Sequence, residues 1–420
     1  MKILFISYFY PPLGGPAALR NQKTVKYLSE PGCSIDVISV GNIEYNSIDE
    51  SLLQDCREHS IMRTGSFDPM ALLKKLSGSK GNVSKQIYHG TPEKLKLLIR
   101  RLYPLDDKVG WLPQLYHAAR KALQHNNYDL IYVSCGPFSS ALAVRWLSKR
   151  FGVPYVLEMR DYWTLLSDYN LQGTALNRAF NRAWEKRILQ DAALVVTATK
   201  GIADDLAEVY GSKLAEKSMV LYNGHDEADF ADLTATNRTD TRFVISYFGA
   251  MYARRSLKAL FAAVKGLQNK ADIVIKLYGN YHLETKQEIE QSGIADSIQI
   301  IPQLSHREAL QQMLASDALL LVINSGSPKG TLTSKVFEYL RLGKPILALI
   351  PKFSEAAELL AESGQSYIAP MESRQKIAEC LQRLIHEKEN SFHYQAQKYE
   401  RQSQIVLLFE RLTAIQRLTR

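Results

Sequence analysis

The feature that most limits how this chain can fold is a regular alternation of short apolar runs with longer amphipathic stretches. Short runs rich in Ile, Val, Leu and Tyr are typical of strands that are buried on both faces, and the stretches between them have helical apolar spacing. This alternation predicts an α/β fold built on doubly wound parallel sheets. The runs lie at 3–7, 35–40, 130–134, 155–158 and 194–198, and then at 244–247, 273–278, 298–301, 318–323 and 345–350.

The chain has 420 residues, which is too long for one hydrophobic core and long enough for two domains of roughly 200 residues each. A polar stretch, Asn223 to Thr241, separates the two series of runs, and we place the interdomain linker there. The predicted domains are 1–225 and 226–402, followed by a C-terminal helix in 403–420. Two such sheets leave a crevice at the carboxyl ends of their strands, where ligands of these folds bind.

The sequence favours a soluble protein in a reducing compartment. It has no apolar run long enough to span a membrane, and its first residues, MKILFISYFYPP, lack the pattern of a signal peptide. The cysteines have neither the density of a disulfide framework nor the spacing of a zinc site, namely Cys33, Cys56, Cys135 and Cys380. We therefore expect a cytoplasmic location.

One segment carries most of the formal net charge of +9. Residues 70–101 contain eight Lys and Arg against Glu93 alone, and residues 69–113 mix these cations with apolar side chains. This mixture is typical of a helix that lies on anionic lipid, so we expect peripheral contact with a membrane surface. An ordinary solvated helix is the alternative. Nucleic acid is a weaker interpretation, because no recognised binding module is present.

The first apolar run leads into a glycine pair, in YPPLGGPAALR. Gly14 and Gly15 stand at a strand-to-helix turn, where glycine lets the backbone approach an anion and the helix N-terminus favours phosphate. A tight turn without a ligand is the alternative interpretation. The pair lacks the GxGxxG order of a dinucleotide site.

A second motif lies in GSPKGTLTSKVFEYLRLGKPILAL, residues 326–349. A flexible loop ends at Thr333 and Ser334, either of which can cap the helix that follows. Lys335 and Glu338 are three residues apart and share one face of that helix. Lys335 could neutralise a diphosphate whose charge grows as a bond to sugar breaks, and Glu338 could accept hydrogen bonds from ribose hydroxyls. The alternative is an exposed ion pair, which is common on helices.

A third group of polar side chains follows the apolar run at 155–157. These residues are Glu158, Arg160, Asp161 and Trp163, and their place at a strand end directs them toward the crevice. We expect Asp161 to interact with an acceptor or a transferred sugar, with Arg160 near its charge. The alternatives are that Asp161 caps the next helix and that Trp163 fills the core.

The sequence predicts no metal site and no cofactor. The acidic pairs Asp106-Asp107 and Asp204-Asp205 lack the strand-flanked spacing that holds a divalent ion between diphosphate oxygens. The histidines show no metal-ligand spacing, and only His225, beside the predicted hinge, stands out.

Several segments together resemble family 4 glycosyltransferases of the GT-B superfamily. They are TSKVFEYLRLGKPI, YFYPPLGGPAALR, VLEMRDYW, LYNGHDEADF and YFGAMYARRSLKAL, and they occur in the family's order over nearly the whole chain. The resemblance implies two Rossmann-like domains, the first binding the acceptor and the second the nucleotide sugar, with the C-terminal helix packed on the first. It also implies metal-independent sugar transfer with retention of configuration.

The resemblance also implies roles for single residues. Glu338 would bind the ribose, and Lys335 and Arg255 the diphosphate, with Arg254 as a second candidate. Together with Asp161 at the strand end, Lys335 and Arg255 form the catalytic set that we expect. The full set of donor-binding residues that we expect, from the resemblance and from the loop before Lys335, is Gly14, Gly15, Gly249, Arg254, Arg255, Gly330, Thr331, Leu332, Thr333, Lys335 and Glu338.

The chain departs from the family pattern at two places. Many relatives have a Glu where this chain has Gly330, and often an Arg where it has Ala250. Backbone N–H groups of the loop 327–331 would then hold the sugar or phosphate, and phosphate binding would depend more on Lys335 and Arg255.

The expected partners are a nucleotide diphosphate sugar and a glycan or lipid-linked acceptor, in cell-surface polysaccharide or glycolipid synthesis. Two other functions stay open at this stage. One is a nucleotide-sugar epimerase of the same fold, and the other is a non-catalytic protein that binds nucleotide sugar or glycan.

Overall fold

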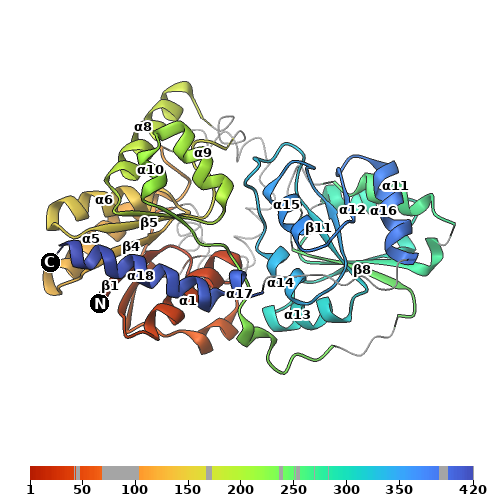
Figure 1. The fold of residues 1–420 in the computed structure, drawn as a ribbon, viewed down its shortest axis with the longest axis horizontal. Coiled ribbons are helices and arrows are strands. Elements are labelled where there is room, and N and C mark those ends of the chain that lie inside the picture. The colour runs from red at the N-terminus through yellow and green to blue at the C-terminus, as the bar shows by residue number, and fades with distance from the viewer. Residues whose placement is uncertain are drawn as a thin grey trace. The chain divides into compact units, whose positions relative to one another are not determined.

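The chain forms two compact units in the computed structural model, which describes residues 1–41, 43, 48–68, 104–166, 173–235, 240–249, 251, 256–268, 270–281, 283–386 and 396–419 (Figure 1). The first unit comprises Met1–Tyr222 and Arg401–Arg420, and the second comprises Asn223–Glu400. The predicted boundaries after 225 and 402 differ slightly from these. His225 belongs to the second unit because its backbone pairs with that of Tyr399 and Glu400.

The first unit contains a 7-stranded sheet in which every pairing is parallel. Its order is β3-β2-β1-β4-β5-β6-β7. The strands are β1 (Lys2–Ser7), β2 (Ser34–Val40), β3 (Ser60–Thr64), β4 (Leu130–Ser134), β5 (Tyr155–Met159), β6 (Leu194–Thr197) and β7 (Ser218–Val220).

Helices cover both faces of this sheet. They are α1 (Pro16–Ser29), α5 (Leu112–His125), α6 (Ser139–Phe151), α8 (Ala175–Asp191), α9 (Lys200–Tyr210), α10 (Lys213–Glu216) and α18 (Arg401–Thr419), with short 3-10 helices η1 (Glu50–Asp55) and η2 (Val109–Trp111). Successive residues of β1 point to opposite faces, so Leu4 and Ile6 join the core under α5, α6, α8 and α9, whereas Ile3 and Phe5 face α1 and α18. Continuous apolar strands are therefore required, as the sequence predicts.

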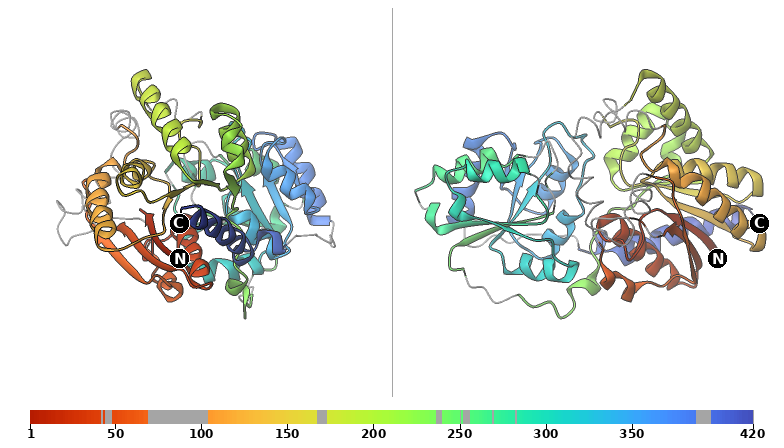
Figure 2. Two further views of the ribbon diagram at one scale, coloured as in Figure 1. Left: turned by 60° about the vertical axis from the view of Figure 1, so that its left-hand side comes forward. Right: turned by 180° about the vertical axis from the view of Figure 1, so that it is seen from behind.

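The C-terminal helix α18 packs within the first unit. Its Ile405, Leu408 and Leu412 are buried in one cluster with Val25 and Leu28 of α1. Both views of Figure 2, like Figure 1, place the chain's two ends in this unit.

The second unit contains a 6-stranded parallel sheet of order β10-β9-β8-β11-β12-β13. The strands are β8 (Phe243–Phe248), β9 (Ile273–Tyr278), β10 (Ile298–Ile301), β11 (Ala318–Val322), β12 (Ile346–Leu349) and β13 (Ile368–Ala369). The helices are α11 (Lys258–Lys265), α12 (Leu283–Glu290), α13 (His306–Ala315), α14 (Lys335–Arg341), α15 (Glu355–Glu362), α16 (Arg374–His386) and α17 (Ala396–Tyr399), with η3 (Glu227–Phe230), η4 (Lys270–Asp272) and η5 (Ala295–Ser297).

The prediction of doubly wound parallel sheets is confirmed, and each predicted apolar run contains a strand. Three strands lack a predicted run, namely β3, β7 and β13. Strand β3 is an edge strand whose residues Ser60 to Arg63 are exposed, so it has no continuous apolar run. Among the described residues, no helix combines the length and the apolar composition that crossing a membrane requires.

Candidate functional site

Each sheet reverses its strand order at one place, and ligands of open parallel sheets bind at the carboxyl ends of the strands there. The reversal lies between β1 and β4 in the first sheet and between β8 and β11 in the second. Gly14 and Gly15 follow β1, Gly249 follows β8, and the loop that ends at Lys335 follows β11. Three of the segments predicted from sequence therefore leave strands at these reversal points.

In the second unit, the structure brings Lys335 against the end of β8. Its Nζ lies 4.9 Å from the centroid of the Tyr247 ring, and a Cβ atom added at Gly249 would collide with that Nζ. Gly249 has a φ of +122°, which L side chains rarely adopt. The backbone conformation thus requires glycine at 249, and any side chain there would displace the Lys335 ammonium group. Gly249 and Lys335 therefore form one predicted unit at the switch point, with Lys335 as its cation.

Glu338 lies beside a histidine that the sequence did not single out. The Nε2 of His306, the first residue of α13, is 2.9 Å from Oε1 of Glu338, and its Nδ1 is 3.9 Å from Oδ2 of Asp229. All three side chains are mostly buried. The imidazole therefore fixes the rotamer of Glu338. Only the tertiary fold brings these residues together, because 32 positions separate His306 from Glu338 in the chain.

The loop after β11 contains the other predicted donor residues, Gly330, Thr331, Leu332 and Thr333. Gly330 is buried, and the N–H of Thr331 donates to the carbonyl of Pro328 over 3.0 Å. The Oγ1 of Thr333 is buried and has no hydrogen-bond partner among the described residues. Its hydroxyl can therefore bond to a ligand without breaking a protein contact that the structure describes.

The structure does not support the predicted helix caps near this loop, and it does not describe the two predicted arginines. Ser334 takes the N-cap position of α14 but makes no side-chain capping hydrogen bond, so neither candidate cap acts as expected. Arg254 and Arg255, like Ala250, lie outside the described residues, so the phosphate-binding role of the two arginines stays a prediction.

In the first unit, Gly15 takes the N-cap position of α1. Its φ of +92° and ψ of 170° are almost restricted to glycine, and a Cβ there would meet nothing within 4 Å. The residue is glycine for its backbone conformation, and it leaves open space beside the first turn of α1. Pro16 begins that helix, as is common at this position.

Arg160 joins the loops that follow β4 and β5. Its Nε donates to the carbonyl of Cys135 over 2.8 Å and its Nη2 to that of Gly136 over 3.0 Å, while its guanidinium lies 5.9 Å from the Phe9 ring. A Cβ at Gly136 would come within 2.8 Å of the guanidinium. The segment 135–138 is thus a part of this strand edge that the sequence analysis missed, although its Gly-Pro pair marks a turn.

Asp161, next to Arg160, is exposed at the end of β5. Of the four predicted acceptor residues, it has the one carboxylate with exposed surface, although the surrounding protein partly desolvates the group and raises its pKa against the charges of Arg160 and Arg20. Its acceptor role stays a prediction that the local geometry permits.

Glu158 corrects a prediction, because its side chain is fully buried and cannot touch an acceptor. It forms an ion pair with Arg20 of α1 at 2.8 Å, and Arg20 also donates to the carbonyl of Leu221 over 2.7 Å. Burial alone would raise the pKa of Glu158, but the charge of Arg20, the nearby Ser134 hydroxyl and the charge of Arg160 together lower it. The carboxylate is ionised, and it fastens α1 to the sheet.

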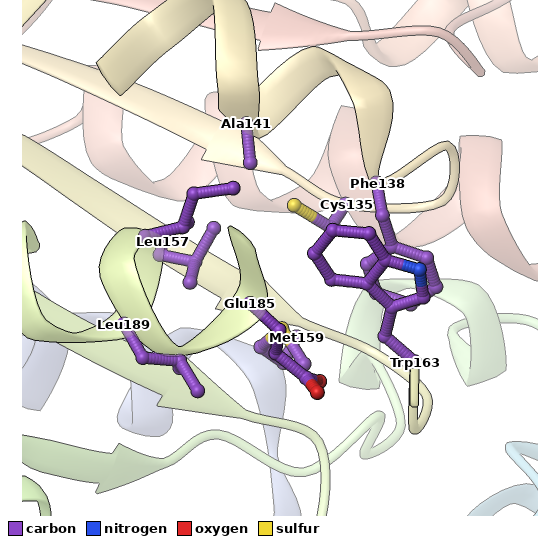
Figure 3. Close-up of a pocket in the computed structure, with 9 residues that line it drawn as sticks. Cys135, Phe138, Ala141, Leu157, Met159, Trp163, Glu185 and Leu189 are labelled. Carbon is purple, nitrogen blue, oxygen red and sulfur yellow. The ribbon is translucent and has the colours of Figure 1, made fainter. Parts of the chain in front are cut away.

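Trp163 corrects a second prediction. It is 2% exposed and stacks on Phe138 with 5.1 Å between ring centroids. Figure 3 shows both rings beside a narrow space that Cys135 and Glu185 also line, and that space has no room for a water molecule. Trp163 therefore fills the core, which was the alternative that the sequence left open.

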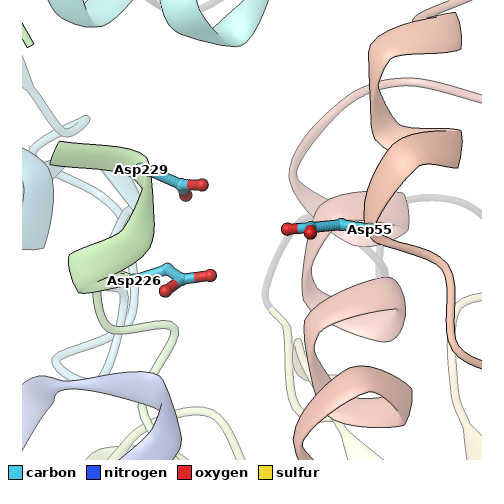
Figure 4. Close-up of side chains that lie close together, drawn as sticks. All are labelled: Asp55, Asp226 and Asp229. Carbon is cyan, nitrogen blue, oxygen red and sulfur yellow. The ribbon is translucent and has the colours of Figure 1, made fainter. Parts of the chain in front are cut away.

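Three further carboxylates, Asp55, Asp226 and Asp229, are drawn in Figure 4. Asp55 ends η1 of the first unit and pairs with Lys23 and Lys26 at 3.0 and 2.9 Å. In the second unit, Asp226 accepts a hydrogen bond from the N–H of Ala228, and Asp229 faces His306. Each carboxylate has a partner inside its own unit, and the expected absence of a metal stays a prediction.

His225, the histidine singled out from sequence, is part of a local network in the second unit. It is buried, and its Nε2 lies 2.9 Å from Glu227, which accepts two hydrogen bonds from Arg341 at 2.6 and 2.7 Å. Burial lowers the pKa of His225 despite Glu227. This network fastens η3, which contains Asp229, to α14, which contains Glu338, so it helps to hold both carboxylates in place.

Two family models match the chain. Residues 92–224 match the model described as "Glycosyl transferase 4-like domain", and residues 230–402 match "Glycosyl transferases group 1". The second match contains Gly249, His306, Lys335 and Glu338. Comparison with curated protein sequences gives no match.

Solved structures with the same fold cover nearly the whole chain. HepE of Anabaena, in complex with UDP and glucose, is 17% identical with a TM-score of 0.62, over 100% of this chain and 98% of that one. Sucrose-phosphate synthase of Thermosynechococcus elongatus is 14% identical with a TM-score of 0.65, over 99% and 94%. A UDP-GlcNAc 2-epimerase of Neisseria meningitidis, bound to UDP-GlcNAc, is 13% identical with a TM-score of 0.58, over 99% and 100%. At these identities the likeness establishes the fold alone.

Proposed function

The chain belongs to the GT-B glycosyltransferases of family 4 type, and from this premise we propose that it moves a sugar from a nucleotide diphosphate donor to a glycan or lipid-linked acceptor. The observation that carries the proposal is the cationic group at the end of β8 in the second unit. Lys335 stands there against Gly249, and Glu338 follows one helical turn later, held by His306. A lysine and a fixed carboxylate at that spacing suit a diphosphate and a ribose.

We assign the donor to this second unit. Charge on the leaving diphosphate grows as the bond to the anomeric carbon breaks, and a fixed ammonium group stabilises that charge more than it stabilises the ground state. Lys335 is the described residue placed for this task, and Arg255 is its predicted helper. The Thr333 hydroxyl and the backbone near Gly330 are the groups we assign to the sugar or phosphate, in place of the missing glutamate.

UDP is the nucleotide that we propose to test first, because two of the structural relatives are complexes with UDP or UDP-GlcNAc. We assign the acceptor to the edge of the first sheet, where Asp161 is exposed and Arg160 is fixed on the 135–136 loop. Retention of configuration, independence from metal and a place in cell-surface polysaccharide or glycolipid synthesis complete the proposal. Contact of residues 69–113 with a membrane also stays a proposal, since residues 69–103 lie outside the described part of the chain.

A thermal-shift panel with UDP, GDP, ADP and their sugars tests the donor assignment. A ligand at about a hundred times its dissociation constant should stabilise the folded protein by about 2.7 kcal/mol. Lys335→Ala and Glu338→Ala should lose that shift and transfer activity. Lys329→Ala is the matched control, because Lys329 lies in the same loop but its side chain is 63% exposed and pairs with Glu358. Equal losses in all three variants would contradict the assignment.

A nucleotide-sugar epimerase is the second candidate, since one of the structural relatives is such an enzyme. Incubation of the pure protein with donor alone separates the two functions. A transferase gives only slow hydrolysis without acceptor, whereas an epimerase gives a new nucleotide sugar at full rate.

A further inference from the structure

An apolar stripe crosses three neighbouring helices of the first unit, α5, α6 and α8. The ring of Tyr116 lies 6.4 Å from that of Trp146, Trp146 lies 6.2 Å from Trp184, and Trp184 lies 6.2 Å from Phe180. Trp146 is 39% exposed and Phe180 45%, and Leu176, one turn before Phe180, is 82% exposed. We call these five residues the aromatic stripe. An exposed stripe of this length is unusual on a monomer and indicates a binding surface.

The surroundings of the stripe are strongly basic. The three helices carry nine Lys and Arg against two carboxylates, Glu185 and Asp191. Glu185 is buried and accepts hydrogen bonds from Thr164 and Tyr210, so it faces inward. Asp191 pairs with both Arg145 and Lys149, at 2.7 and 2.8 Å. The outer face of these helices is therefore positive.

Cations and rings alternate on this face. The guanidinium groups of Arg145 and Arg187 lie 5.5 and 5.3 Å from the centroid of the Trp184 ring. Exposed Lys149 and Arg150 follow Trp146 by three and four residues and so share its face of α6, as Arg187 shares the face of Trp184 on α8. Tryptophan, phenylalanine and leucine insert at the boundary between headgroups and acyl chains, while lysine and arginine extend to the headgroups. Both requirements of an anionic lipid surface are met by one face.

We propose that the α5–α6–α8 face docks on a membrane surface that contains anionic lipid. Charge complementarity selects this occupant, because anionic headgroups attract juxtaposed Lys and Arg over a Debye length. A second copy of the chain would bring two positive faces together, which like-charge repulsion disfavours.

The inference rests on the proposed function in one respect only, which is that a lipid-linked acceptor would be held in the membrane on which the enzyme docks. The surface itself uses none of the donor residues. None of its five residues lies in the basic segment at 69–113, since Tyr116 is the first of them in the chain.

Vesicle flotation with the full-length protein tests the proposal. The wild type should float with vesicles of phosphatidylglycerol and phosphatidylcholine in equal parts, and should stay behind with phosphatidylcholine alone or in 1 M salt. The double variant Leu176→Ser/Phe180→Ser should lose at least tenfold in partitioning. The matched control is Phe353→Ser/Leu418→Ser, which removes the same two residue types from positions that are 81% and 88% exposed elsewhere. It should bind like the wild type.

Tryptophan fluorescence gives a second readout at the surface itself. Of the four tryptophans, Trp111 and Trp163 are buried, so a blue shift on adding anionic vesicles reports on Trp146 and Trp184. Trp146→Phe should remove most of the shift. Absence of a blue shift in the wild type would overturn the proposal.

Two further outcomes would overturn the proposal. One is equal flotation of both double variants. The other is a dimer in light scattering that the stripe variant abolishes, because the surface would then bind a second copy of the chain. A failure of the proposed function is visible separately. In that case no nucleotide sugar shifts the melting temperature, whatever the vesicle assay gives.

Discussion

Replacing Glu158 by Gln should destabilise the first unit by about 3–5 kcal/mol, which is the cost of leaving one partner of a buried ion pair unneutralised. The structure sets this magnitude, because Glu158 is 0% exposed and Arg20 is 2% exposed, at 2.8 Å from each other. Gln keeps the shape of the side chain but removes the negative charge. The Arg20 guanidinium then stays buried without a counter-ion.

Tryptophan fluorescence can follow this unfolding selectively. All four tryptophans lie between positions 111 and 184, so they belong to the first unit. For a unit of this size, about 3–5 kcal/mol corresponds to a fall in melting temperature of roughly 6–20 °C. The variant Glu208→Gln is the control, because this exposed side chain of α9 should change stability by less than about 0.5 kcal/mol.

A rescue and a pH profile sharpen the test. Replacing both partners, in Arg20→Met/Glu158→Leu, should recover most of the lost stability, because no buried charge then lacks a partner. The pKa of Glu158 is lowered from 4.5, so the stabilisation is complete above pH 4.5 and is lost as the pH falls through the lower folded-state value. The difference between wild type and Glu158→Gln should therefore shrink below pH 4.5. A Gln variant within about 1 kcal/mol of the wild type at pH 7 would refute the reasoning.

Three other predictions concern the donor site. Gly249→Ala should lower UDP affinity at least tenfold in calorimetry, because the new Cβ displaces Lys335. Gly343→Ala is the control: it is also at positive φ but has open space around it, so UDP affinity should stay unchanged. Equal affinities in the two variants would contradict the contact between Gly249 and Lys335. His306→Ala should reduce the preference for UDP over 2′-deoxy-UDP, because Glu338 loses the imidazole that holds it, while affinity for 2′-deoxy-UDP stays the same; an unchanged preference would exclude this role. Addition of EDTA should leave the transfer rate within about twofold, and a loss that Mg²⁺ or Mn²⁺ restores would show that a metal takes part.

Much of the fold could be predicted from the sequence because buried parallel strands need continuous apolar runs. The runs at 3–7 and 318–323 contain β1 and β11 for this reason. The sequence did not predict strand β3, because an exposed edge strand needs no continuous apolar run. The first compact unit ends at Tyr222, three residues before the predicted boundary, and the backbone pairing of His225 with Tyr399 is a long-range contact that no local sequence pattern indicates.

The candidate site could be predicted only where local sequence carries its geometry. Lys335 and Glu338 share a helix face by their spacing, so their proximity follows from the chain itself. His306 begins α13 and Glu338 lies on α14, and the two meet only in the folded chain, so no spacing rule reveals their contact. Glu158 was expected to face a ligand because it lies near the end of a strand. Its side chain instead points to the face of the sheet that α1 covers, where it pairs with Arg20, and the local sequence does not indicate that contact.

The central claim is that the second unit binds the nucleotide diphosphate through Lys335 and Glu338. A crystal structure of the full chain with UDP measures this most directly. The claim predicts a phosphate oxygen within about 3 Å of the Lys335 Nζ and a ribose hydroxyl at a similar distance from the Glu338 carboxylate. A nucleotide bound with both side chains out of reach would contradict it.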